Sequence, residues 1–283
     1  MGMWKDSYAV GHDLIDSQHK ELFRMTDDLG EALQRQDGDG PAACARAVAF
    51  LKDYVVKHFA DEEALQASLG YAGLEAHRRL HRDFVATVLE YEKELIASNF
   101  DNKVAQRFAG KLIGWLIYHV VGEDGKITGA ISAAAPAQSS SAPFITCFAD
   151  SAREVLGQML DAAVEITPEP PAPLGDKSDI SVSVGIVGDK PGSAEFVFPL
   201  VTALRVVQTL TMMPAADFGE MTESALREIA NIISGNAASR IAETGCACDI
   251  TTPKLFRGQR PLPADGKVIK SDFGSLAVFI ADA

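Results

Sequence analysis

Apolar residues recur at three- and four-residue intervals through the first half of the chain, which is the spacing of helices with one buried face. This pattern predicts four helices, near residues 16–35, 41–66, 74–97 and 103–122. Turn-forming stretches separate them, and Pro41 is suited to the first turn of the second helix. Four helices with short connections predict an antiparallel bundle.

A different pattern follows residue 143. Residues 144–164 keep the helical spacing, but DISVSVGIVG alternates apolar with small residues, as a half-buried strand does. The sequence after it predicts a strand in SAEFVFP, helices near 200–213 and 220–244, and strands in CDITTPKLF, GKVIK and SLAVFIA. The second half is therefore expected to be an α+β domain, an α/β sandwich with a mostly antiparallel sheet.

The run GAISAAAPAQSSSAP, residues 129–143, is small, uncharged and rich in turn formers, which is typical of a linker. All six histidines precede it. We therefore predict two domains with different roles, residues 1–130 and 144–283, joined by a flexible linker at 131–143.

Charge and composition exclude several classes of protein. The chain has 283 residues and a net charge of −13, so nucleic acid and anionic membranes are unsuitable partners. No segment has the length and apolar character of a membrane span or a secretory signal. The four cysteines are too sparse for a disulfide scaffold, which favours a reduced, cytoplasmic protein. The pair Cys246 and Cys248 could bind a soft metal, but buried, inert thiols are the favoured interpretation.

The histidines of the first half are placed in a way that single surface histidines do not explain. His58 and Glu62 are four residues apart in the second predicted helix, and so are His77 and His81 in the third. The first and fourth helices add one imidazole each, His19 and His119, and Asp124 follows five residues after the latter. Residues four apart share one helix face, so both pairs can point into the bundle. Burying these groups without a cation would cost several kcal/mol, roughly, for the charges alone, which predicts a metal site.

The number of donors indicates which metal. Seven nitrogen and oxygen ligands exceed the coordination of one zinc ion, and none is a thiolate. Two six-coordinate ions would share five imidazoles, two bridging carboxylates and a bridging oxide or hydroxide, and one position would stay open. This arrangement is a binuclear iron site with room for a small ligand, provided that the carboxylates bridge.

Asp124 requires a local departure from the regular helix. Five residues correspond to about 140° around an α-helix, so Asp124 cannot share a face with His119 unless the backbone changes between them. Gly122 lies between them and makes such a departure inexpensive.

Other residues near the donors have simpler interpretations. Glu63 is about 100° from Glu62 around the helix and is expected to be solvated. His12 precedes the first helix and is expected to be an ordinary surface histidine. Core positions at helical spacing, which could also line a ligand pocket, are Trp115, Leu22 and Phe23.

Four stretches, SYAVGHDLIDSQHKELF, HFADEE, HRRLH and WLIYHVVGED, resemble the hemerythrin family in its bacterial form, over residues 4 to about 130. The resemblance implies an oxo- or hydroxo-bridged pair of non-haem iron ions that binds dioxygen at the open position. Members of this family also sense oxygen, nitric oxide or redox state. The iron ligands implied by the resemblance, with Glu62 and Asp124 bridging, are His19, His58, Glu62, His77, His81, His119 and Asp124.

The helix near 220–244 has an apolar stripe and an opposite polar face. The apolar stripe comprises Leu226, Ile229, Ala230, Ile233 and Ala237. The opposite face carries Ser224, Glu228, Asn231, Gly235 and Ser239. Gly235 in mid-helix costs about 1 kcal/mol relative to alanine, and close approach of a partner would account for it. On periodicity alone, Glu228 and Asn231 would be polar residues on a solvated surface.

The stretch ESALREIANIISGNAASRI, followed by CDITTP, resembles the CheC/CheX/FliY chemotaxis phosphatases, and CheX in particular, from about residue 144 to the end. The matching positions are Glu228, Asn231 and Pro253. The resemblance implies hydrolysis of the aspartyl phosphate of a CheY-like receiver domain. Asn231 would orient the attacking water, and Glu228 would engage a basic group of the receiver, which supplies its own Mg²⁺. A single such motif agrees with CheX, whose members form homodimers through their sheets.

These features together predict a cytoplasmic signalling protein, in which a diiron sensor regulates a phosphatase acting on a response regulator. One alternative is an oxygen-binding or scavenging protein whose second domain only dimerises or localises it. Another is an adaptor that binds a receiver without hydrolysing its phosphate. The sequence leaves open whether oxygen, nitric oxide, peroxide or redox state is the signal.

Overall fold

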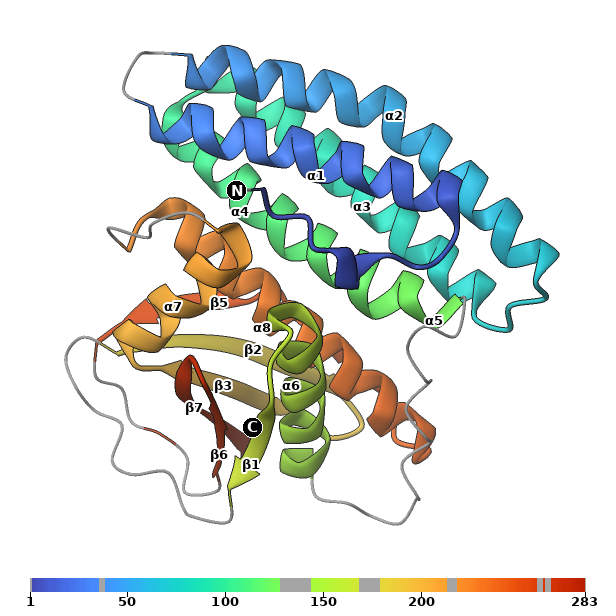
Figure 1. The fold of residues 1–283 in the computed structure, drawn as a ribbon. Helices are drawn as coiled ribbons and strands as arrows, with labels where there is room; N and C mark the ends of the chain where they lie inside the picture. The colour runs from blue at the N-terminus through green and yellow to red at the C-terminus, as the bar shows by residue number, and fades with distance from the viewer. Residues whose placement is uncertain are drawn as a thin grey trace. The chain divides into compact units, whose positions relative to one another are not determined.

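The computed structural model describes residues 2–35, 39–127, 144–167, 179–212, 218–258, 262 and 266–282. The chain divides into two compact units, Met1–Ala133 and Ala134–Ala283 (Figure 1). The linker predicted at 131–143 lies outside the described residues, so the predicted domain boundaries stay predictions.

The first unit is a four-helix bundle, as predicted. Its helices are α1 (Asp13–Gln34), α2 (Gly40–Ser68), α3 (Leu74–Ala97) and α4 (Asn102–Tyr118), preceded by a short 3-10 helix, η1 (Asp6–Tyr8). Neighbouring helices along the chain contact each other, and α4 also contacts α1, which closes the bundle (Figure 1). The predicted fourth helix is α-helical only to Tyr118. It continues as a π-helical segment, η2 (His119–Asp124), and a short helix, α5 (Gly125–Ile127).

Local sequence explains how these helices begin and pack. Asp101 caps α4, because its carboxylate accepts hydrogen bonds from the backbone N–H groups of Lys103 and Val104. Pro41 lies in the first turn of α2, as expected. Fully buried side chains that fill the bundle are Phe23, Leu29, Leu51, Leu95, Phe108 and Leu112.

The second unit is an α/β sandwich. Its helices are α6 (Phe144–Leu160), α7 (Leu200–Thr211) and α8 (Glu220–Glu243). Its strands are β1 (Val164–Thr167), β2 (Ile180–Gly188), β3 (Gly192–Phe198), β4 (Cys248–Ile250), β5 (Lys254–Arg257), β6 (Gly266–Ser271) and β7 (Gly274–Asp282). The strand order is β1-β6-β7-β3-β2-β4, with β5 also paired to β2, and every pairing among the described strands is antiparallel.

Most of the predicted elements of this unit are confirmed, with one correction. Strand β1 was not expected, because residues 144–164 were predicted as one helix. The helix ends at Leu160, and Asp161 adopts a left-handed backbone conformation that turns the chain toward β1. The alternating apolar residues of β2 are buried, as predicted: Ile180, Val182, Val184 and Ile186. Val187, near the end of the strand, is exposed.

Helices α6, α7 and α8 contact one another as well as the sheet, so together they form one layer over it. The predicted apolar stripe of α8 is confirmed, since Leu226, Ile229, Ala230, Ile233 and Ala237 are all fully buried. The ring of Phe148 on α6 lies 6.4 Å from that of Phe196 on β3, within this core.

Strands β4 and β5 are two parts of one edge, interrupted at residues 251–253. At the interruption, the Thr251 hydroxyl accepts a hydrogen bond from the Gly185 N–H (3.0 Å), and the Thr251 N–H donates to the Gly185 carbonyl (2.9 Å). A Cβ at Gly185 would lie 2.7 Å from that hydroxyl, so this position requires glycine. Pro253 lies in the same interruption. None of the described helices is long and apolar enough to span a bilayer.

Candidate functional site

All seven donors predicted from the sequence meet inside the bundle. Helix α1 contributes His19, and α2 contributes His58 and Glu62. Helix α3 contributes His77 and His81, while the π-helical segment contributes His119 and Asp124. Each of the seven is 2% exposed or less. The two residues of each i, i+4 pair on α2 and α3 therefore point into the bundle together, as expected from helix geometry.

The donors form two groups that share Glu62. The first group is Glu62 with His77, His81 and His119, and the second is Glu62 with His19 and His58. Within each group the donor atoms lie within 4.8 Å of one another. The Oε1 atom of Glu62 is 2.7 Å from Nε2 of His77, and its Oε2 atom is 3.7 Å from Nε2 of His58. The same Oε2 atom lies 3.4 Å from Nε2 of His81 and 3.6 Å from Nε2 of His119, so this oxygen contacts imidazoles of both groups.

Asp124 also spans the two groups. Its Oδ2 atom lies 3.1 Å from Nε2 of His19, and its Oδ1 atom lies 3.3 Å from Nε2 of both His77 and His119. Both carboxylates therefore contact imidazoles of both groups.

The π-helical segment explains how Asp124 reaches the cluster. A regular α-helix places residues five apart on different faces, whereas π-helical i→i+5 bonding brings them together. Two such pairs are in contact here, His119 with Asp124 and Tyr118 with Glu123, whose hydroxyl and carboxylate are 2.5 Å apart. The departure predicted around Gly122 is confirmed, and this residue lies within the segment.

The cluster satisfies a test for a metal site. Six buried donor atoms that face it have no hydrogen-bond partner: His19 Nε2, His58 Nε2, His77 Nε2, Glu62 Oε2, Asp124 Oδ1 and Asp124 Oδ2. A buried polar atom without a partner costs about 1–3 kcal/mol. Metal ions would use these lone pairs, and a set of five imidazoles and two carboxylates without thiolate suits iron.

His58 and the two carboxylates have the charge state that metal ligands need, whereas His77 does not. Burial lowers the pKa of His77, but its contacts with Asp124 and Glu62 outweigh burial and raise this pKa to about 10, so a bound cation would have to displace a proton there. Burial, together with the nearby imidazole of His19, lowers the pKa of His58 to about 3, so His58 is neutral. Burial works against ionisation of Glu62, but close contacts with His119, His77 and His81 hold its pKa well below the usual value. Burial also opposes ionisation of Asp124, and the neighbouring imidazoles nevertheless lower its pKa to about 2. Both carboxylates are therefore ionised at neutral pH, as ligands must be.

Aromatic rings form a wall against the imidazoles. Phe59 stacks on His81 with ring centroids 3.6 Å apart. Trp115 stacks on His119 at 4.2 Å and on Phe84 at 3.7 Å. Trp115 was predicted as a core residue, but it is only half-buried, and its ring contacts the donor His119. This wall fixes the ring planes and shields the donors from water.

Glu63 corrects an expectation from the sequence. It was predicted to be solvated, but its Oε1 atom lies 2.9 Å from Nδ1 of His81. Its other oxygen accepts a hydrogen bond from Nε of Arg78 at 3.1 Å. The helical wheel of α2 alone could not reveal these contacts, because both partners come from α3.

Two glutamines near the donors were also missed. The Oε1 atom of Gln18 lies 3.0 Å from Nδ1 of His58, and its Nε2 atom donates to Asp61 at 2.7 Å. Gln66 donates to Glu62 Oε1 at 2.5 Å and is fully buried. Gln66 is four residues after Glu62, so this spacing was a usable signal. His12 is not part of the cluster; it is half-buried and precedes α1.

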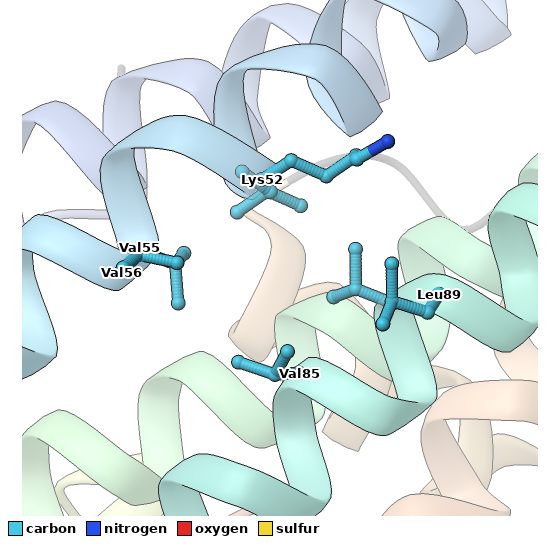
Figure 2. A pocket seen from close by; sticks show the side chains of 7 residues that line it. Lys52, Val55, Val56, Val85 and Leu89 are labelled. Atoms are coloured by element: carbon cyan, nitrogen blue, oxygen red, sulfur yellow. The ribbon is translucent and has the colours of Figure 1, made fainter.

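A shallow apolar pocket of about 180 Å³ lies between α2 and α3 and contains none of the seven donors. Figure 2 shows Val55 and Val56 of α2 facing Val85 and Leu89 of α3. Lys52 stands at its edge and is paired with Glu92 at 2.8 Å. The pocket is therefore separate from the candidate metal centre.

In the second unit, α8 carries Glu228 and Asn231 three residues apart, hence on neighbouring turns of one face. The expectation that this polar face is solvated is wrong for part of it, since Ser224 and Glu228 are buried and Asn231 is half-buried. A Cβ at Gly235 would meet no atom within 4 Å, so packing does not require glycine there. The start of α8 is fixed to the sheet edge by Glu223, which pairs with Arg227 (3.1 Å) and with Arg257 of β5 (2.5 Å). The described cysteines are all free. Cys246 and Cys248, which were expected to be buried, are half-buried, and among the described cysteines only Cys44 is fully buried.

Comparison with known proteins gives matches in both units. Residues 10–131 match the hemerythrin HHE cation binding domain, and residues 221–257 match the CheC-like family. Bacteriohemerythrin of Pseudomonas aeruginosa (strain LESB58) is 33% identical over 129 residues, which are 46% of this chain and 80% of that protein. Myohemerythrin of Riftia pachyptila is 37% identical over 127 residues, 45% of this chain and 91% of that protein.

Solved structures similar to the chain include the chemotaxis protein CheX from Vibrio vulnificus, with 23% identity and a TM-score of 0.45. The match covers 52% of this chain and 100% of that protein. A CheX–CheY complex with BeF3 and Mg²⁺ from Borrelia burgdorferi matches with 28% identity and a TM-score of 0.42, over 50% of this chain and 97% of that one.

Proposed function

Since the chain belongs to the hemerythrin family through its first unit and matches the CheC-like family in its second, we propose that it is an iron-dependent sensor that regulates a receiver-domain phosphatase. The signal is oxygen or redox state, and the reaction is hydrolysis of the aspartyl phosphate of a CheY-like receiver. The observation that carries the first half is the buried cluster of seven donors in two groups that share Glu62.

The donors divide between two iron ions. His77, His81 and His119 would hold one ion, His19 and His58 would hold the other, and Glu62 and Asp124 would be shared. The side with two imidazoles then has one protein ligand fewer, which leaves room for a small ligand such as dioxygen. Iron held by these residues would supply reversible electron transfer to such a ligand.

The residues around the ions determine how the site behaves. Phe59 and Trp115 hold the rings of His81 and His119 and limit access of water. Water exclusion would slow irreversible oxidation of the centre. Gln66 orients the shared carboxylate of Glu62 through its amide.

The second half of the proposal rests on α8. Asn231 would hold the attacking water through its side-chain amide, and Glu228 would bind a basic group of the receiver. Positioning provides most of the catalysis in phosphoryl transfer, and the receiver's own Mg²⁺ neutralises the phosphate. The match to the CheC-like family over residues 221–257 includes Glu228, Asn231 and Pro253, which supports this assignment. Homodimerisation through this unit is part of the proposal, and analytical ultracentrifugation tests it.

Regulation would pass through the end of the bundle. The π-helical segment supplies two donors, His119 and Asp124, and α5 follows it directly in the sequence, which then continues to the second unit. A ligand regulates the phosphatase only if it favours one arrangement of the protein over another. The connectivity of these donors is what motivates this part of the proposal.

The deciding experiment measures the lifetime of a phosphorylated CheY-like receiver with the full chain added. The assay is run anaerobically with the diferrous protein and again after oxidation, with the double variant Glu228→Ala, Asn231→Ala as control. Faster decay that differs between the two iron states and vanishes in the variant is the expected result.

Other outcomes identify the rival functions. Receiver binding without faster decay would indicate an adaptor. Two bound iron ions with neither receiver binding nor faster decay would indicate an oxygen-binding protein with a non-catalytic second unit. Equal decay in both iron states would show that the phosphatase is not regulated by the metal centre.

A further inference from the structure

The two groups of donors differ in what holds their imidazoles from outside. Nδ1 of His81, in the three-imidazole group, lies 2.9 Å from a carboxylate oxygen of Glu63. Nδ1 of His58, in the two-imidazole group, lies 3.0 Å from the amide oxygen of Gln18. In each case the outer partner accepts a hydrogen bond from Nδ1–H, which leaves Nε2 as the donor that faces Glu62.

Other outer contacts do not cancel this difference. His77 and His19, one from each group, have an Nδ1 atom without a hydrogen-bond partner among the described residues. The comparison between the groups therefore depends on Glu63 and Gln18, one charged and one neutral.

Resting on the diiron centre proposed above, we propose that Glu63 and Gln18 are positioning residues that make the two iron sites electronically unequal. The carboxylate of Glu63 strengthens His81 as a donor and places a negative charge behind it. The ion held by His77, His81 and His119 is therefore oxidised at the lower potential, and the ion held by His19 and His58 keeps its ferrous state longer.

The physical reason is the charge of the hydrogen-bond acceptor. A carboxylate accepting from an imidazole N–H raises the basicity of the opposite nitrogen more than a neutral amide does. A more basic ligand and a nearby negative charge both stabilise the ferric ion relative to the ferrous ion. The Glu63 side chain is only 25% exposed, so water screens this charge incompletely.

Arg78 moderates the effect. Its guanidinium donates to the other oxygen of Glu63 at 3.1 Å, and it also pairs with Glu75 at 2.5 Å. Removal of the Arg78 charge should therefore strengthen the influence of Glu63 on His81, whereas removal of the Glu63 charge should abolish it. Substitutions that remove the charge of Arg78 and of Glu63 are thus expected to shift the lower midpoint potential in opposite directions.

The test is a potentiometric titration of the iron-loaded full chain with redox mediators, followed by its visible spectrum. In each one-electron step, one ferrous ion loses an electron to an oxidised mediator. Glu63→Gln keeps the size and the acceptor atom and is expected to raise the lower of the two midpoint potentials. Arg78→Gln is expected to lower it. Glu75→Gln is the matched control, since Glu75 contacts Arg78 but no imidazole, and it should leave both potentials nearly unchanged.

A second test adds a carboxylate in the two-imidazole group, where Gln18 is the outer partner of His58. The variant combines Gln18→Glu with Asp61→Asn. The second substitution is needed because Gln18 donates to Asp61 at 2.7 Å, and two carboxylates there would repel. This pair preserves the net charge and places a carboxylate behind His58. The higher midpoint potential is expected to fall, so that the two steps move closer together.

Iron content separates failure of this inference from failure of the proposed function. If the wild-type chain does not hold two iron ions, the proposed diiron function is wrong. If it does, and neither Glu63→Gln nor Arg78→Gln shifts a potential, or both shift it the same way, the inference is overturned. Should the two steps merge, the midpoint of the merged step must still rise in Glu63→Gln and fall in Arg78→Gln. Substitutions of such outer partners lower metal affinity by about 10–100-fold, so titrations use excess iron and circular dichroism verifies folding.

Discussion

Deletion of Val121 is expected to leave the metal centre intact, although this residue lies between two of the donors. The π-helical segment contains the extra residue that separates His119 from Asp124 by five positions. Val121 is half-buried, whereas Val120 is fully buried, so Val121 can be removed with less loss of packing. Without it, the segment can form a regular α-helix.

The geometry gives the expected size of the change. In an α-helix each residue turns the chain by about 100°, so residues four apart differ by about 40° and residues five apart by about 140°. The deletion places the aspartate four residues after His119, on nearly the same face. It also places Glu123 four residues after Tyr118, which preserves their hydrogen bond. Insertion of one alanine after Val121 would instead place Asp124 six residues after His119, which is about 240° around the helix from it.

The assay is the iron content of the purified protein, together with its visible spectrum and its thermal unfolding. The deletion variant should hold two iron ions per chain, as the wild type should, and the insertion variant should hold fewer. The unfolding of the second unit provides an internal control for expression and folding. A deletion variant that has the helical content of the wild type but loses iron would refute the role assigned to the π-helical segment.

Three further results are expected. Phe59→Ala removes a buried ring stacked on His81 and should destabilise the first unit by about 3–5 kcal/mol in urea unfolding, and a loss below about 1 kcal/mol would contradict the packing described. Burial raises the pKa of Cys44 to about 11, so its thiol is protonated at pH 8. It should therefore react with a disulfide reagent only when the protein unfolds. Rapid modification of Cys44 in the native protein would disprove its burial. Gly235→Ala should stabilise the second unit by about 0.5–1 kcal/mol yet slow receiver dephosphorylation, and unchanged dephosphorylation would show that no partner approaches this site closely.

Much of the fold was accessible from the sequence because its patterns are strong. The four helices of the bundle and strands such as β2 follow from apolar periodicity, which reflects which side of each element faces the core. The end of α6 was harder to predict. Residues 161–164 are compatible with helix, and the strand at β1 forms because its backbone pairs with β6, a partner a hundred residues away.

For the candidate metal centre, the sequence by itself determined the donors. Spacing of four along a helix fixes the face of His58 and Glu62 without knowledge of any other helix, and a spacing of five demands a backbone departure before Asp124. Only the tertiary structure decided how the donors divide into groups and which residues support them. Glu63 contacts His81, and Gln18 contacts His58, because the helices that carry them pack side by side. The distance between side chains on two helices depends on that packing, which the periodicity within one helix does not encode.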